Sequence, residues 1–363
     1  MKKSSLICRR AFSIFFVLTF VFLPFLGSAT ADGVIFGKRD AVFYLDQDSQ
    51  YAVIHYANGI QRMLLSVSFP WQQSSNTAWI FPLPSDPQSI RVRIVDGAPE
   101  FGGTNIIEEA MEDVENALPV FAVSYPLSAV IPWPLTLITY YGTTGLIGGT
   151  TAGTTVHKHL EMYGLVVEVI SATEGVSIYN YLTDKGLEIS EGIIPQLDDY
   201  VEANYSFVVT WIKESGTTLR EPGVIVEFPT EEIFYPWMLT SIYGNDIIPM
   251  EILIVGHVSP RIYDEIRPYV DVTYWRGWVS HVEQDMSFVL QDFVRSIRHR
   301  WDGSFTAIEL SAPSSTFVDD LWIKMEVPEK VIRAEVIHRL IGGPGLILTF
   351  LILFVIASPL IGL

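Results

Sequence analysis

Cysteine is almost absent from this chain. Its 363 residues include one cysteine, Cys8, and that residue lies in an N-terminal segment that we expect to be removed. A mature chain without cysteine forms no disulfide, holds no metal through thiolates and offers no thiol nucleophile. No G-x-S-x-G sequence occurs either, so the common serine-hydrolase signature is missing as well.

Basic residues are also scarce. The chain has 23 Lys and Arg against 41 Asp and Glu, and its formal net charge is −18. This imbalance excludes a general nucleic-acid binder and a protein that is held to an anionic membrane by charge. Hydrophobic residues make up 49% of the chain and charged residues 18%, which is too apolar for a disordered protein.

The N-terminal residues 1–31 have the features of a secretory signal. A basic stretch precedes the apolar run AFSIFFVLTFVFLPFLG, and Ala29 and Ala31 form an A-x-A cleavage site. Cleavage removes four basic residues and no acidic one, which leaves 19 basic against 41 acidic residues. An uncleaved N-terminal anchor is the alternative. In both cases the body of the protein is exported from the cytoplasm.

The C-terminal residues 340–363 contain no charge. As a helix, the part from Leu346 onward is about 27 Å long, close to the hydrocarbon thickness of a bilayer. Because the segment has no polar face, it predicts a transmembrane helix. Lys330, Arg333 and Arg339 precede it on the side that we place outside, against the positive-inside rule, but a long exported domain largely overrides flanking charge. We therefore expect a single-pass protein of the cell membrane with its body outside the cytoplasm.

The pattern between these ends predicts an α+β fold. We expect a β-rich N-terminal part at 32–118 that ends in a helix, an uncharged segment at 119–157, and an α+β part at 158–330. Asn105 is placed to cap a helix over 106–118, and Ser280 with Glu283 forms a capping box for a helix that ends at 297. Helices and strands do not alternate regularly enough for a doubly wound sheet.

The segment 119–157 is rich in proline and aromatic residues and ends in a Gly/Thr tract. Residues 116–157 contain no Asp, Glu, Lys or Arg. Three interpretations remain open: a segment packed within the protein, a contact with the bilayer surface through Trp133, Tyr140 and Tyr141, or a second membrane span. The third would place the C-terminal half in the cytoplasm.

Several sequence blocks resemble one known family. They are WIFPLPSDPQSI, then YGLVVEVISATEGVSIYNYLTDKGLEI followed by LDDYVEANYSFVVTWI, then IVEFPTEEIFYPWMLTSI. Their order resembles the family catalogued as domain of unknown function 2330, over residues 32–325. The resemblance implies a secreted or surface-anchored protein of bacteria or archaea. That family has no established activity, so no catalytic residue is carried over. Its members often have a cysteine-bearing loop where this chain has the Gly/Thr tract.

His157 and His159 are candidate metal ligands. In an extended segment both imidazoles lie on one face, and Glu161 continues that face. Two histidines and a carboxylate can hold zinc, which leads to the hypothesis of a metal-assisted surface hydrolase. The alternative is that these are ordinary polar residues at the end of the Gly/Thr tract.

Tyr274, Arg276 and Trp278 are candidate ligand-binding residues. They alternate along the stretch TYWRGW, so on a strand they share one side. Aromatic rings beside an arginine can bind a sugar or a peptide. The alternative is a packed sheet face. Asn204 begins an N-x-S sequon, which is used only where the host glycosylates.

These observations predict a membrane-anchored extracytoplasmic protein that binds a ligand or an envelope component. We expect no enzymatic activity, no cofactor and no nucleic-acid partner. One alternative is the metal-assisted surface hydrolase that uses His157 and His159. The other is a subunit of a membrane protein complex, which would contact its partner through residues 118–149.

Overall fold

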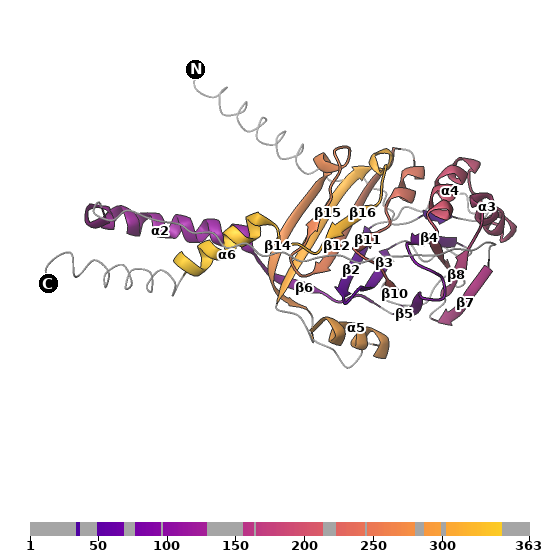
Figure 1. Ribbon diagram of the computed structural model, residues 1–363, viewed down its shortest axis with the longest axis horizontal. Coiled ribbons are helices and arrows are strands. Elements are labelled where there is room, and N and C mark those ends of the chain that lie inside the picture. Colours follow the sequence, from indigo (N-terminus) through magenta and orange to yellow (C-terminus); the bar gives the residue numbers. More distant parts are fainter. Residues whose placement is uncertain are drawn as a thin grey trace, which may run out of the picture.

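Two large β-sheets packed face to face form the body of the protein (Figure 1). The computed structural model describes ten stretches of the chain: 34–36, 49–68, 77–95, 97–128, 155–162, 165–212, 223–243, 245–279, 287–298 and 303–342. The predicted signal with Ala29 and Ala31 lies outside these residues, and so do nearly all of the Gly/Thr tract and residues 343–363 of the predicted C-terminal span. Leu340 and Ile341, where that span was expected to begin, are instead the last two residues of the helix Glu329–Ile341.

The larger sheet has eight strands. In spatial order they are β5 (Arg91–Val95), β10 (Gly223–Pro229), β3 (Ile60–Ser68), β2 (Ser49–Ala57), β12 (Ile247–Val255), β15 (Ser304–Pro313), β14 (Val270–Val279) and β6 (Phe101–Asn105). Strands β2 and β12 pair in parallel, whereas the other neighbours in this sheet are antiparallel.

The second large sheet has five strands, and a third, small sheet has three. The five-stranded sheet has the order β1 (Val34–Phe36), β4 (Thr77–Leu83), β9 (Ser206–Ile212), β8 (Leu165–Ser171) and β7 (Thr155–Met162). The three-stranded sheet has the order β11 (Ile233–Tyr235), β16 (Leu321–Lys324) and β13 (Ser259–Pro260).

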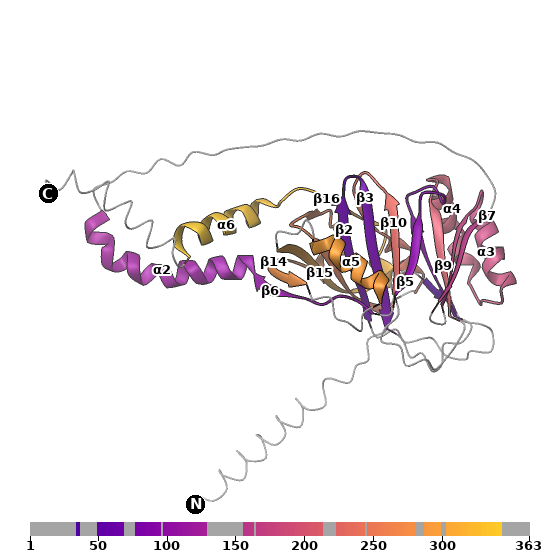
Figure 2. The same cartoon turned by 90° about the horizontal axis from the view of Figure 1, so that it is seen from below.

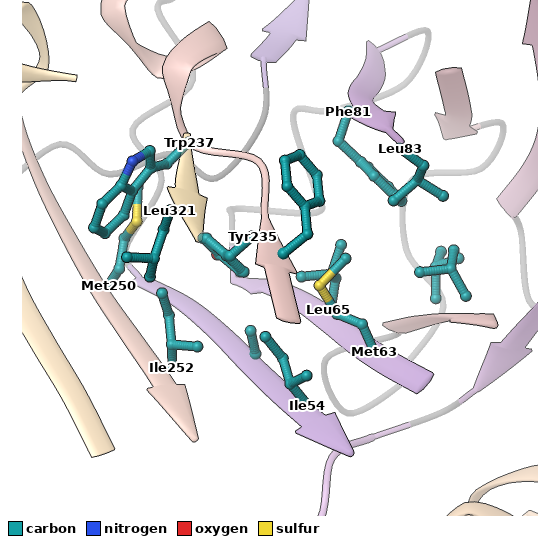
Figure 3. Close-up of a cluster of buried hydrophobic side chains, with 14 of the residues drawn as sticks. Ile54, Met63, Leu65, Phe81, Leu83, Tyr235, Trp237, Met250, Ile252 and Leu321 are labelled. Atoms are coloured by element: carbon teal, nitrogen blue, oxygen red, sulfur yellow. The ribbon is translucent and has the colours of Figure 1, made fainter. Parts of the chain in front are cut away.

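The main core lies between the two large sheets (Figure 3). Ile54 of β2 and Met63 of β3 face Phe81 of β4 across it. Successive strand residues point to opposite faces, so Val53 and Leu64 reach the other side of the larger sheet. The strands are therefore buried on both faces, which explains their nearly continuous apolar sequences.

Helices cover the outer faces of both sheets and give four layers. Helix α5 (Phe288–Arg298) packs on the larger sheet. Helices α3 (Gly175–Asp184) and α4 (Ile194–Glu202) pack on the five-stranded sheet. Short 3₁₀ turns connect several of these elements; they are η2 (Glu191–Ile193), η3 (Met238–Tyr243), η4 (Arg267–Tyr269) and η5 (Ser314–Thr316).

Two further helices leave the body side by side and form an arm, at the left of Figure 1. They are α2 (Ile106–Ser128) and α6 (Glu329–Ile341). Ile106 and Ala110 of α2 pack against Ala334 of α6. Asn105 ends β6 and caps α2, since its Oδ1 accepts a hydrogen bond of 3.0 Å from the backbone N–H of Ile107, as the sequence predicts.

The structure confirms a mixed α+β, strand-rich fold and corrects two helix bounds. Helix α2 does not stop at residue 118 but continues through Pro119 to Ser128. Helix α5 begins at Phe288 rather than near Ser280. Ser287 precedes α5 outside the helix, and its Oγ lies 3.4 Å from the backbone N of Leu290. The predicted capping residues Ser280 and Glu283 lie outside the described residues.

Strands from both halves of the chain are interleaved in the same sheets. The parallel neighbours β2 and β12 come from opposite halves of the chain: Gln50 of β2 pairs with Met250 of β12. A second membrane span within 119–157 would put these strands on opposite sides of a membrane. The shared sheets therefore exclude that interpretation. None of the helices among the described residues is long and apolar enough to cross a bilayer.

Candidate functional site

The three candidate ligand-binding residues of β14 lie on one face of the larger sheet, beside the arm. Trp275, which alternates with them, points the other way and stacks on Phe305 with ring centroids 6.0 Å apart. Tyr274, Arg276 and Trp278 face the side where α2 and α6 leave the body. Their surroundings nevertheless differ, and only one of them presents a large accessible surface.

Tyr274 is a packed residue. Its side chain is 3% exposed, and Lys330 of α6 places its Nζ 4.6 Å from the ring centroid, a cation–π contact. Burial raises the pKa of the Tyr274 hydroxyl to about 12. Tyr274 therefore supports the start of α6, and a ligand has little access to it.

Arg276 belongs to a polar network that joins the sheet to both arm helices. Its Nη1 lies 3.3 Å from Oε2 of Glu109 on α2. The other oxygen of Glu109 is 3.8 Å from Nδ1 of His338 on α6, and that nitrogen lies 2.8 Å from Oδ2 of Asp113. The network fixes the direction of the arm relative to the body. It also holds a partly exposed guanidinium beside a partly exposed carboxylate.

Trp278 is the accessible member of the set, with a side chain that is 53% exposed. The indole covers Gly102 of the edge strand β6, where an added Cβ would come within 2.6 Å of the ring. Gly277 is needed for the same close approach, because its added Cβ would lie 1.8 Å from the carbonyl oxygen of Gly102. The exposed part of the indole offers an apolar surface, and Arg276 and Glu109 nearby offer a donor and an acceptor. Such a combination can recognise a sugar ring or a peptide.

The structure does not bring His157 and His159 together. A β-bulge at His157 shifts the register of β7, so that Val156 pairs with Ile170 and Lys158 with Val169. Nε2 of His157 lies 3.0 Å from Oγ of Ser171, whereas Nδ1 of His159 lies 3.1 Å from Oε1 of Glu168.

The partners of the two histidines lie on opposite faces of their sheet. Ser171 and Glu168 are three residues apart on β8, and side chains at an odd separation on a strand point to opposite sides. The expectation of a shared face assumed a regular strand, and the bulge removes that regularity. Within the described part of the chain, no group of three His, Cys, Asp or Glu side chains is arranged to hold a metal ion.

Glu168 lies at the centre of a cluster of polar side chains that the sequence did not predict. The residue is 6% exposed, and its carboxylate accepts hydrogen bonds from the hydroxyl of Tyr181 on α3 and, at 2.8 Å, from Nε1 of Trp211 on β9. Lys185 lies 3.8 Å from the same oxygen. Burial alone would raise the pKa of Glu168, but the hydrogen bonds from Tyr181, His159 and Trp211 and the charge of Lys185 outweigh it and lower the pKa.

The Glu168 cluster joins α3 to the strands β7, β8 and β9 of the five-stranded sheet. Burial and the neighbouring carboxylate raise the pKa of Tyr181, which keeps its hydroxyl a donor. The sequence did contain one signal, since Glu168 is the one charged residue in the otherwise apolar strand LVVEVIS. Tyr181 and Lys185 also belong to the block YNYLTDKGL that supports the family resemblance.

Asp320 is the second buried carboxyl group that the sequence did not reveal. It is 7% exposed and lies just before β16. Its Oδ1 accepts hydrogen bonds of 2.9 Å from the hydroxyl of Tyr200 and from the backbone N–H of Met238. Burial raises the pKa of Asp320 to about 7, because these bonds compensate only part of the lost hydration.

Asn204, the residue of the sequon, is exposed in the turn after α4. Its backbone φ is 61°, a left-handed conformation that asparagine tolerates better than most residues. Its Nδ2 lies 3.4 Å from the carbonyl oxygen of Glu202. The position is sterically accessible to modification, and the turn gives it a structural role as well.

Comparisons with known proteins show no family for this chain. No family model matches it, and no curated protein matches it. One solved structure that matches is a crystal structure of baculovirus P35; the match covers 81% of this chain and 100% of that chain, with 8% sequence identity and a TM-score of 0.29. Another is a crystal structure of a mutated baculovirus P35 after caspase cleavage; this match covers 78% of this chain and 100% of that chain, with 7% sequence identity and a TM-score of 0.29. At such TM-scores this likeness carries no argument about fold or function. The resemblance to the domain of unknown function 2330 family stays a prediction.

Proposed function

We propose that this is a membrane-anchored protein whose β-sheet body lies outside the cytoplasm and binds a component of the cell envelope without catalysing a reaction. The observation that carries the proposal is the course of α6. This helix leads away from the body beside α2 and ends at Ile341. The uncharged C-terminal run continues directly from that end.

The arm would separate the body from the membrane surface. Helix α6 has 13 residues and is therefore about 20 Å long. The contacts of Lys330 with Tyr274 and of His338 with Asp113 hold both ends of α6 in place. The arm would accordingly act as a stiff spacer, because two packed helices bend less than a flexible linker.

The surface around Trp278 is the binding face that we propose. The buried carboxyl groups Glu168 and Asp320 already have several internal partners, whereas the indole of Trp278 is half exposed. Envelope polysaccharides present pyranose rings whose C–H faces stack on indole. Arg276 and Glu109 would then hydrogen-bond to the hydroxyl groups.

Membrane extraction tests the anchoring. The full chain should stay in the membrane fraction through alkaline carbonate washing and dissolve only in detergent. A chain that ends at Gly342 should be extracted from the membrane fraction by the same carbonate washing. Protease added to intact cells should digest the body. Release of the full chain by carbonate, or protection of the body from the protease, would contradict the proposal.

Titration with soluble oligosaccharides tests the binding face. The Trp278→Ala variant should bind about fivefold to tenfold more weakly than the wild type, since losing a stacked aromatic side chain costs about 1 to 1.4 kcal/mol. The matched control is Phe288→Ala, which removes an aromatic side chain that is 76% exposed on α5. Equal binding by the wild type and both variants would refute the assignment to Trp278. Lack of binding to any envelope saccharide would refute the ligand class.

A further inference from the structure

The two arm helices run in the same direction in a defined register. Ile106 and Ala110 of α2 lie against Ala334 of α6. Further along, Asp113 bonds to His338, and an added Cβ on Gly342 would lie 2.7 Å from a carboxylate oxygen of Asp113. Asp113 of α2 is thus level with the last turn of α6 and with Gly342, which follows it. Helix α2 continues beyond the end of α6 (Figure 2).

Charge ends at the same level on both chain segments of the arm. The last charged residue of α2 is Glu115, and none follows until Lys158. The last charged residue of α6 is Arg339, and none follows to residue 363. These two positions are more than 200 residues apart in the sequence, yet the packing places them at one height along the arm. A common limit for charge on packed parallel helices is what the boundary between water and hydrocarbon imposes.

The part of α2 beyond this level differs from the part before it. The proximal part carries acidic residues beside its apolar positions, as expected for a helix in water. The distal part, residues 118–128, reads LPVFAVSYPLS and has no charge at any position around the helix. A soluble helix that packs on a protein partner through one face keeps a charged or strongly polar face toward water.

We propose that residues 118–128 of α2 insert into the outer half of the bilayer next to the C-terminal segment. This inference rests on the proposed function, because it needs that segment to be the membrane anchor. Eleven helical residues extend about 16 Å, roughly half of the hydrocarbon thickness of about 30 Å. The chain has to return to the same side, because Thr155 begins β7 in the body. The distal part of α2 is therefore a second, half-depth contact with lipid.

Single-cysteine labelling tests this inference with little background. The chain has one cysteine, Cys8, so a Cys8→Ser background is free of thiols. Three reporters are introduced one at a time into the full chain in native membranes: Met111→Cys on the proximal part of α2, Phe121→Cys on the distal part, and Leu351→Cys in the C-terminal run. A membrane-impermeant maleimide is added before or after detergent.

We expect the rate of maleimide labelling to fall between the proximal and the distal part of α2. Met111 is 62% exposed, so its cysteine should react at once in both conditions. The cysteines at positions 121 and 351 should react at least about tenfold more slowly in membranes and become reactive in detergent, because thiolates react and hydrocarbon suppresses thiol ionisation. Val123→Cys serves as a second distal reporter if the Phe121 variant does not accumulate.

Three results would contradict these proposals, and each has a different meaning. If the cysteine at position 351 reacts in intact membranes, the C-terminal run is no anchor and the proposed function fails. If position 351 is protected but positions 121 and 123 react as fast as position 111, the anchor stands and the insertion of α2 is refuted. Protection of positions 121 and 123 that persists in detergent would show that a protein surface covers them, and would also overturn the contact with lipid.

Discussion

Asp320 makes the most specific stability prediction. The pKa of its carboxyl group rises from 3.8 to about 7 in the folded protein, mainly because the group is buried. The folded state therefore binds a proton more tightly than the unfolded state. Between about pH 4 and pH 7 the folded chain holds more protons, so the contribution of Asp320 to the free energy of unfolding falls as the pH rises. Above the pKa of the folded state, burying the ionised carboxylate lowers the free energy of unfolding by a constant amount, the penalty.

The size of this penalty follows from the shift. Each unit of pKa corresponds to about 1.4 kcal/mol, so a shift of roughly three units costs about 4 kcal/mol above pH 7. The variant Asp320→Asn cannot ionise. Its amide oxygen can still accept the hydrogen bonds that Tyr200 and Met238 donate to Oδ1. We expect the variant to be more stable than the wild type by up to about 4 kcal/mol at pH 8, and of nearly equal stability at pH 4.

The measurement is urea unfolding of chains that end at Gly342, followed by tryptophan fluorescence from pH 4 to pH 8. The difference between wild type and variant at each pH removes the contribution of all other titrating groups. Asp264→Asn is the control for the loss of one negative charge, because the Asp264 side chain is 84% exposed. A difference between wild type and Asp320→Asn that stays constant across this pH range would refute the reasoning.

Three further predictions concern other parts of the body. Replacing Glu168 by Gln should lower the free energy of unfolding by about 3 kcal/mol at pH 7, because it removes a buried charged acceptor. This loss of stability should become smaller as the pH falls through the lowered pKa of Glu168, and urea unfolding at pH 3 and pH 7 measures it. Gly277→Ala should destabilise the protein by more than about 2 kcal/mol, since the added methyl group collides with backbone, whereas Gly192→Ala, which meets a side-chain atom at 3.4 Å, should change the melting temperature little. The purified body should hold no stoichiometric zinc, because His157 and His159 bond to partners on opposite faces of their sheet; zinc that is lost in the His157→Ala/His159→Ala variant would instead support the metal-assisted hydrolase.

The candidate sites were only partly visible in the sequence. Alternation along TYWRGW placed Tyr274, Arg276 and Trp278 on one face, because side-chain direction in a strand is a local property. Which of them is accessible depends on α2 and α6, which come from distant parts of the chain. The exposure of Trp278 and the burial of Tyr274 were therefore beyond any local pattern.

By itself, the sequence determined the local features of this protein. These are the α+β class, the cap at Asn105 and the positions at which charge ends, all of which depend on residue type and short-range spacing. Tertiary structure alone decided which strands are neighbours, as the pairing of β2 with β12 shows. It also decided the bulge at His157 and the partners of Glu168 and Asp320. Hydrogen-bond partners and pKa values depend on groups that are far apart in the chain, and only folding brings those groups together.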